Sequence, residues 1–312
     1  MTCPVHSASN VMNLPASGAA TGIVERFEEV AGSVFVGLFA AALFDQTMLP
    51  AVSAALERTG RIRNTPWERA TRSAASDQIV FLGEDADSTA EMERLKLLHR
   101  DVKGIGPDGT RYSALNPENW NWILISTFFM YRGAFVALTG EKLSAADNQA
   151  LWDHVRTKTE PLQLPGRSRL VEGYPELCAY YDQMAAEKLT VTPTLIAAME
   201  TVRRAPRPPF FPAATEPLWR LARPVAGHVA AVLGYGTMHP GARRVLPIRW
   251  TRRHDLEFVV LTTLFRVAYC ALPTWATDTP LARNRRRYRR LMSTYQRVGL
   301  PSFVPDQPIA SA

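Results

Sequence analysis

His99 is the residue whose type and setting could carry cofactor chemistry. Met92, Leu95, His99 and Val102 recur at 3–4–3 spacing, which places them on one buried face of a helix. A neutral imidazole that faces an apolar interior is how a helical bundle presents an axial ligand to haem iron. The alternative is a core histidine that is hydrogen-bonded to a backbone carbonyl, and the spacing alone favours that alternative.

Two lysines flank this histidine in the sequence. Lys96 and Lys103 lie three residues before and four residues after His99, so a continuous helix would place both on its face. Cations at these two positions could pair with the carboxylates of haem propionates.

A second group of candidate residues precedes them, in the segment PWERATRS. Arg69, Arg72 and Ser73 occupy positions i, i+3 and i+4, so two guanidinium groups and a hydroxyl can converge on one helical face. Charge-assisted donors of this kind suit a bound oxygen species, a carboxylate or a propionate. The alternative, which this segment alone favours, is a solvated basic face.

Among the lone acids we single out only Glu57, as a candidate general base.

Helix-start signals recur along the chain and would position these residues. Thr65 to Glu68 form a capping box with proline at the first helical position, and Ser88 with Glu91 forms another. They predict a helix that carries Arg69 and a helix that carries His99, the second ending near residue 104. We also expect a long apolar helix over residues 23–44, a helix over 50–60, an aromatic-rich helix over 116–140, and helices from Ser144, Pro175, Pro193, Glu216, Thr251 and Thr279.

The fold class follows from this pattern. Hairpin dipeptides between alternating runs and a βαβ rhythm are both absent from the sequence, so we expect one all-α domain over residues 23–300 with about ten helices. Residues 1–22 are small and polar, which predicts a disordered N-terminal segment. Residues 301–312 are expected to form a flexible C-terminal tail.

Composition narrows the class of protein. A hydrophobic content of 46% with 21% charged residues excludes a disordered chain. Three widely spaced cysteines exclude a disulfide scaffold and a zinc ribbon, and the six histidines are too scattered for an obvious multi-histidine metal site. The N-terminus lacks a signal-peptide pattern, and the apolar run over residues 30–44 is shorter than the roughly 18–20 residues of a membrane span. We therefore expect a cytoplasmic protein.

The net charge of +7 is unevenly distributed along the chain. Residues 201–312 contain 18 arginines, no lysine and five acids, a charge of +13, whereas the first 200 residues sum to −6. The run ARNRRRYRR over residues 282–290 is the candidate for nucleic-acid binding. One interleaved aromatic, Tyr288, offers little base stacking, so a solvated last helix is the favoured interpretation and a nucleic-acid partner is not expected. The arginine-rich end could instead dock on anionic lipid.

Taken together, three stretches resemble the MpaB-type oxygenase family, which includes the latex-clearing protein, a rubber oxygenase. The middle stretch is the most specific, because a histidine on a basic helix, then VKG, a PDG turn and YSALNP form a long ordered pattern. The resemblance runs roughly over residues 34–290. The stretches are LPAVSAALERTGRIRNTPWERATRS, then RLKLLHRDVKGIGPDGTRYSALNPENW and, more loosely, PLWRLARP followed by LPIRW.

The resemblance implies a single globin-like, all-helical domain around a haem b pocket. It also implies cleavage of carbon–carbon double bonds of isoprenoids with dioxygen. The axial histidine of the family, the iron ligand, falls on His99. The distal arginine and the two polar positions after it fall on Arg69, Arg72 and Ser73, and the basic positions around the haem fall on Lys96 and Lys103.

Two histidines of the family pattern are missing from this sequence. Many relatives have histidine at the positions of Leu49 and Leu124, so His99 is the only matched histidine ligand, which is consistent with haem held by one histidine. Arg72 stands where the rubber oxygenase has lysine. Arginine stays protonated and is therefore a poorer axial ligand than lysine.

The sequence thus predicts a haem b-dependent oxygenase that uses dioxygen on an apolar substrate, isoprenoid or lipid-like, by oxidative cleavage of a C=C bond. One alternative is a haem-dependent hydroxylase or peroxidase. Others are a non-catalytic haem- or lipid-binding protein, and a helical protein that binds nucleic acid through its arginine-rich end.

Overall fold

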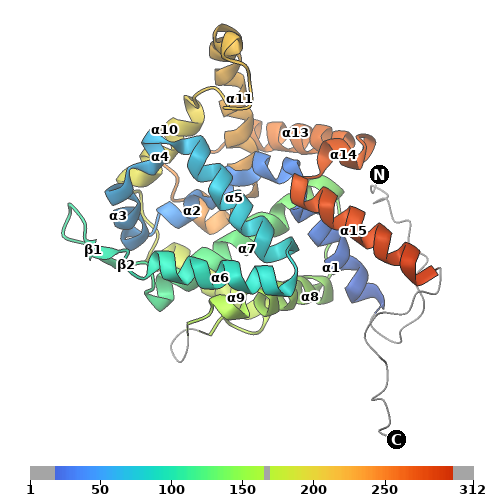
Figure 1. The fold of residues 1–312 in the computed structure, drawn as a ribbon. Coiled ribbons are helices and arrows are strands. Elements are labelled where there is room, and N and C mark those ends of the chain that lie inside the picture. Colours follow the sequence, from blue (N-terminus) through green and yellow to red (C-terminus); the bar gives the residue numbers. More distant parts are fainter. Residues whose placement is uncertain (1–17, 165–168, 298–312) are drawn as a thin grey trace, which may run out of the picture.

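The described part of the chain is almost entirely helical. The computed structural model describes residues 18–164 and 169–297 (Figure 1). Within these ranges the chain forms 15 α-helices, three 3₁₀ helices and one two-stranded hairpin, and eleven of the α-helices have ten or more residues. The all-α class is therefore confirmed, and the expectation of about ten helices fits the longer ones. A globin-like arrangement around a haem pocket stays a prediction.

Most of the long helices begin at or within one residue of the predicted starts. Ser144 and Asp147 form the expected capping box of the helix that follows. The helices with this agreement are α3 (Pro50–Thr59), α5 (Pro66–Leu82), α8 (Ala145–Lys158), α9 (Tyr174–Glu187), α10 (Pro193–Arg203), α11 (Glu216–Thr237), α13 (Arg252–Ala271) and α15 (Pro280–Arg297). The short helices α4 (Arg61–Asn64), α12 (Pro240–Arg243) and α14 (Thr274–Thr277) were not predicted.

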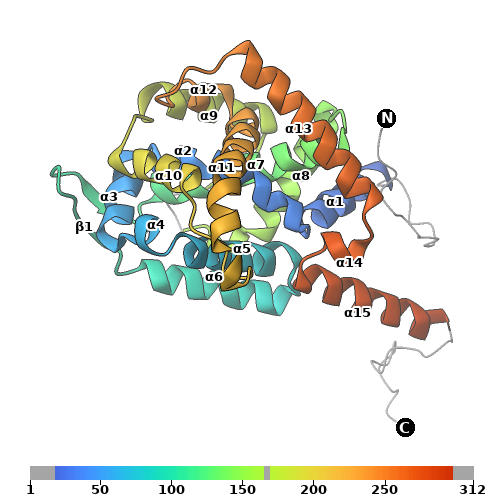
Figure 2. The same cartoon turned by 90° about the horizontal axis from the view of Figure 1, so that it is seen from above.

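Helix α7 (Pro117–Thr139) lies at the centre of the molecule (Figures 1 and 2). The side chain of Asn116 caps its first turn, and 13 of its 23 residues are buried. It contacts helices on several sides, including α1, α8, α11 and α13. By length and hydropathy α7 could cross a membrane, as could the bent pair Val34–Thr47 and Pro50–Arg58 if it formed one span. The burial of α7 is equally typical of the core helix of a soluble protein.

A buried carboxyl, Asp45 of α2 (Phe44–Thr47), ties this core together. It accepts hydrogen bonds of 2.5 Å from the Ser126 hydroxyl of α7 and from the Tyr181 hydroxyl of α9. The indole of Trp122 donates to the backbone oxygen of Asp45 at 3.3 Å. Burial raises the pKa of Asp45 to about 6, although the two hydroxyl donors favour its charged form.

The prediction of one long helix over residues 23–44 is wrong, because the helix is interrupted at Gly32 and Ser33. Helix α1 (Gly18–Ala31) ends there, and a 3₁₀ helix, η1 (Val34–Leu43), follows. A Cβ on Gly32 would lie 2.8 Å from the Cβ of Ala282, so α15 approaches too closely for a side chain. The hydroxyl of Ser33 accepts from the Phe35 amide and donates to the Thr277 carbonyl, which starts the new turn.

The predicted disordered segment over residues 1–22 lies only partly within the described residues. Residues 18–22 belong to α1, whereas residues 1–17 lie outside the described ranges. The predicted tail over residues 301–312 also lies outside them. The single domain expected over residues 23–300 is described as far as residue 297.

A small hairpin replaces the end of the helix expected to run to residue 104. Helix α6 (Asp85–His99) ends at His99, and strand β1 (Lys103–Ile105) pairs with β2 (Arg111–Ser113) in antiparallel register. Gly109, at a φ of 84°, closes the predicted turn between the two strands. The helical face that was expected to hold Lys103 beside His99 therefore does not exist.

The arginine run over residues 282–290 lies in α15. We expected this helix to be solvated, but part of the run forms ion pairs with the rest of the protein. Arg286 bonds to Glu29 at 3.0 Å and to the buried Asp278 at 2.9 Å. Arg285 bonds to Glu28 at 2.9 Å, and Arg289 also approaches that carboxylate, at 3.5 Å. One side of the run therefore docks α15 onto the acidic face of α1, which leaves fewer cations for an external partner.

We predict that Arg286→Ala lowers the free energy of unfolding by about 3 kcal/mol, because it leaves the carboxylate of Asp278 buried without its cation. The matched control is Arg287→Ala, one residue on, whose exposed side chain has no carboxylate partner among the described residues. That control should change stability by less than about 0.5 kcal/mol. Urea unfolding of both variants measures the difference, and equal losses would disprove the docking role.

Candidate functional site

Helices α5 and α6 form the pair that carries the candidate residues. Two hydrogen bonds join them near their connecting turn: Ser76 donates to Glu91 at 2.5 Å, and Ser88 donates to the carbonyl of Val80 at 2.8 Å. The helices diverge away from this turn, toward the start of α5 and the end of α6 (Figure 1). Arg69 belongs to that end of α5 and His99 to that end of α6. Arg69 and His99 therefore both lie toward the end of the pair that is away from the connecting turn.

His99 is half-buried and held in one orientation. Its Nδ1 lies 2.7 Å from the carbonyl oxygen of Leu95, and its ring meets the indole of Trp120 edge-on, with centroids 5.3 Å apart. A carbonyl can only accept, so Nδ1 carries the proton and Nε2 presents its lone pair. Nε2 has no hydrogen-bond partner among the described residues. The carbonyl bond is the one expected of a core histidine, and the same bond orients metal-ligating histidines.

The ring of His99 lies beside an apolar cluster. A cluster of buried side chains lies under α6 and includes Met92 and Trp120, with Leu95 and Leu124 packed against it. The Trp120 indole donates to the Leu162 carbonyl at 2.7 Å, which fixes the ring that the imidazole meets. An imidazole with a free Nε2 beside such a cluster can bind a flat, largely apolar group.

Both positions where relatives carry further histidines are filled by core leucines. Leu49 is 4% exposed and belongs to the main core, whereas Leu124 packs against both apolar clusters. Neither can supply a ligand, so among the described residues His99 is the one matched histidine.

Arg69, Arg72 and Ser73 do not converge as their spacing suggested. The guanidinium of Arg72 bonds to Glu68 at 2.6 Å, and its side chain is 64% exposed. Ser73 is exposed, whereas Arg69 is half-buried. The solvated basic face therefore describes Arg72, and Arg69 is the less exposed arginine of this set.

The two lysines around His99 also differ. Lys96 is half-buried and bonds to Glu93 at 2.6 Å, one turn before the histidine. Lys103 lies on strand β1 and is exposed, so it does not share the helical face of His99. Lys96 is therefore the better placed of the two cations for an anionic group bound next to His99.

The sequence analysis missed an acid on α5. Asp77 follows Ser73 by four residues and Arg69 by eight, a spacing that could have indicated it. The hydroxyl of Tyr131 on α7 donates to its carboxyl at 3.3 Å, and no cation pairs with it among the described residues. Burial raises the pKa of Asp77 to about 7, and the Tyr131 hydroxyl only partly opposes that rise. This carboxyl can therefore hold or release a proton near neutral pH.

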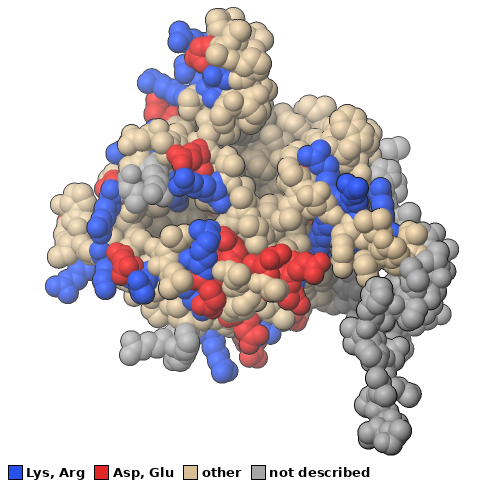
Figure 3. Space-filling model, in the orientation of Figure 1, with Lys and Arg blue, Asp and Glu red and all other residues tan. Residues whose placement is uncertain are grey.

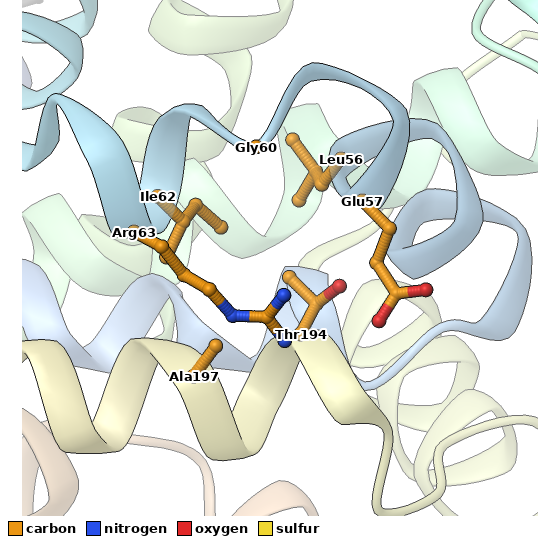
Figure 4. Close-up of a pocket in the computed structure, with 7 residues that line it drawn as sticks. All are labelled: Leu56, Glu57, Gly60, Ile62, Arg63, Thr194 and Ala197. Atoms are coloured by element: carbon orange, nitrogen blue, oxygen red, sulfur yellow. The ribbon is translucent and has the colours of Figure 1, made fainter.

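Glu57 lies apart from these residues, in a small pocket between α3, α4 and α10 (Figure 4). Glu57 and Arg63 reach toward Thr194 from opposite sides, above the apolar floor of Ala197. The described residues that line this pocket do not include Arg69 or His99. The candidate general base is therefore in a separate hollow, which is too small for a cofactor.

The donor set fits a haem better than a bare metal ion. Among the described residues, His, Cys, Asp and Glu side chains form no group of three that could hold a metal ion. A haem iron takes four ligands from its porphyrin and needs only one from the protein. His99, with its anchored Nδ1 and available Nε2, meets that requirement.

Asp77 generates a prediction about stability and pH. Its folded pKa, about 7, is above the ordinary value of 3.8, so folding favours the protonated form. The contribution of Asp77 to the free energy of unfolding is therefore fully present below pH 3.8, and it is lost as the pH rises through 7. Raising the pH from 5 to 8 should lower the unfolding free energy by about 2 kcal/mol more in the wild type than in Asp77→Asn.

Urea unfolding at both pH values tests this expectation. Tyr131→Phe removes the one described donor to the Asp77 carboxyl and should move the loss to higher pH. Equal pH dependence in the wild type and in Asp77→Asn would contradict the burial of an ionisable carboxyl there.

Comparison with known proteins identifies the family. Residues 28–269, most of the chain, match the family described as ER-bound oxygenase mpaB/B'/Rubber oxygenase, catalytic domain. No curated protein and no solved structure matches the chain. The family match covers η1, the Glu57 pocket, the α5–α6 pair and α7, so it spans all the candidate residues described above. The chain therefore belongs to the mpaB/rubber oxygenase family, and residues 28–269 are its oxygenase catalytic domain.

Proposed function

We propose that this protein is a haem b-dependent oxygenase that uses dioxygen on an apolar, isoprenoid or lipid-like substrate, with oxidative cleavage of a C=C bond as the reaction. Family membership supports the oxygenase activity. The observation that carries the haem assignment is the setting of His99: its Nδ1 is anchored, its Nε2 has no partner among the described residues, and its ring meets Trp120 of an apolar cluster.

His99 would hold the iron through Nε2, and Lys96 would pair with a propionate. Haem supplies, when bound, the binding and activation of dioxygen. The protein supplies ligation, polarity and access. The hydrogen bond from His99 to Leu95 uses Nδ1 and fixes the ring, so Nε2 is the nitrogen that would bind the iron.

Arg69 and Asp77 would provide the polar chemistry on the facing helix. Arg69 is a permanent cation, so it can stabilise negative charge that develops on an oxygen atom of the reacting substrate. Asp77, with a pKa of about 7, can hold a proton on the same helix. Arg72 would contribute little, because its side chain is 64% exposed.

An apolar substrate suits the apolar side chains near His99. Leu95 and Leu124 bring aliphatic surface to the region around His99, and Trp120 brings aromatic surface. Such a lining can desolvate a hydrocarbon chain but offers few hydrogen bonds for a polar one. We also propose a cytoplasmic location, and only the sequence supports that part of the proposal.

The haem assignment predicts the absorption spectrum of the purified protein. It should show a Soret band with stoichiometric iron, and His99→Ala should lower haem affinity more than about tenfold. His228→Ala is the control, because that imidazole is exposed and pairs with Glu257. A His99→Ala protein with full haem occupancy and an unchanged spectrum would disprove the ligand assignment.

The assignment of Arg69 predicts a contrast with Arg72. With isoprenoid alkenes and ¹⁸O-labelled dioxygen, cleavage should place label in both carbonyl products. Arg69→Ala should lower kcat about 100-fold at unchanged haem content, because it removes a preorganised charge donor. Arg72→Ala should stay within about threefold of the wild type. Label in a hydroxyl group of an uncleaved product would instead support a hydroxylase.

A further inference from the structure

The exposed apolar side chains of this protein are concentrated where its positive charge is concentrated. Of the 23 large hydrophobic side chains that are exposed in the described residues, 17 lie between Phe210 and Tyr295. The same part of the chain, from residue 201 on, carries 18 arginines and no lysine. Exposed apolar surface of this extent marks an interaction site in a soluble protein.

Helix α13 shows this exposure most clearly. Its exposed side chains recur at helical spacing, and each is between 58% and 67% exposed: Leu256, Val259, Val260, Leu264 and Val267. The opposite side of the helix packs on the core through Phe258, Leu261 and Phe265. Helix α13 therefore has two apolar faces, and the described structure covers only one of them. We call the exposed face the α13 strip.

Helix α11 extends this surface. Its first half projects from the body of the molecule (Figure 1), and there Leu218, Leu221 and Val225 are each more than two thirds exposed. The projecting end shows uncharged surface on one side and cations on the other (Figure 3). Farther along, His228 bonds to Glu257 at 2.9 Å, so α11 meets α13 next to the start of the strip.

Arginines border the strip. Arg252 precedes Leu256 by one helical turn, and Arg249 lies in the connection just before α13. Both side chains are exposed, and neither has a carboxylate partner among the described residues. Cations at the edge of an apolar helical face are the pattern of a helix that lies in the interface of an anionic bilayer.

We propose that the α13 strip docks this protein on a membrane surface that contains anionic lipid. The strip would enter the boundary between headgroups and acyl chains, while Arg249 and Arg252 contact lipid phosphates. Charge complementarity favours this partner over a second copy of the chain, because a symmetric contact would bring two arginine-bordered faces together. Nucleic acid would use the arginines but would leave the aliphatic strip exposed to water.

Docking of this kind would place the protein on the membrane, in whose acyl-chain region apolar molecules dissolve. The proposal does not depend on haem, on His99 or on the reaction, because every residue that carries it lies on α13 or beside its start. Vesicle binding can therefore fail while the oxygenase activity stands, and the reverse also holds.

Co-sedimentation of the full chain with vesicles tests the proposal. We expect binding to phosphatidylcholine vesicles that contain phosphatidylglycerol, and weaker binding to phosphatidylcholine alone. Leu256→Gln/Val260→Gln should lower the partition coefficient by about tenfold or more, because two apolar side chains no longer enter the bilayer. Arg249→Gln/Arg252→Gln should lower it about tenfold on the anionic vesicles only.

Matched controls separate docking from general effects of substitution. Val191→Gln/Ile196→Gln changes two apolar side chains that are also exposed but lie outside α13, and Lys142→Gln removes an exposed cation outside α13. Circular dichroism confirms that each variant is folded. Controls that bind like the wild type support the proposal.

Three results would overturn it. One is the absence of binding to the anionic vesicles, and another is an equal loss in Leu256→Gln/Val260→Gln and in its control pair. The third is light scattering that shows a dimer which Leu256→Gln/Val260→Gln dissociates, because the strip would then be an interface between two copies. A salt-sensitive gel shift with DNA, in a protein that ignores vesicles, would likewise reject the membrane as partner.

Discussion

The structure depends on the burial of α7, an apolar helix that needs protein contacts on nearly all its sides. Burial of this kind leaves little room for polar groups, and the exceptions are tightly bonded. Asp45 receives hydroxyl donors from α7 and from α9, so one carboxyl fixes three helices relative to each other. The α5–α6 pair then rests against α7 through Tyr131 and Trp120, and this contact sets the places of Asp77 and His99.

The charge asymmetry of the chain has two structural roles. One side of α15 neutralises the acidic face of α1, so part of the arginine excess stabilises the fold itself. Other arginines, such as Arg252, stay at the surface beside exposed aliphatic side chains. A run of like charges in a sequence therefore does not identify a partner until its ion pairs are known.

His99 is held in one orientation by a carbonyl and by an aromatic ring, and its Nε2 has no hydrogen-bond partner among the described residues. A ligand atom must be held in orientation to bind its group. The chemistry of the proposed oxygenase would therefore depend on a few partly buried residues, His99, Arg69 and Asp77, rather than on the many exposed cations.

The sequence by itself determined the helical class, most helix starts and the family, because capping residues and hydrophobic spacing act locally. It also singled out His99 and Arg69. Only the tertiary structure decided that the first long helix breaks at Gly32, where α15 approaches, and that α6 ends at His99. It also showed that Arg72 is more exposed than Arg69. It revealed Asp77 as a buried carboxyl, because that burial depends on α7, a helix that is distant in the sequence.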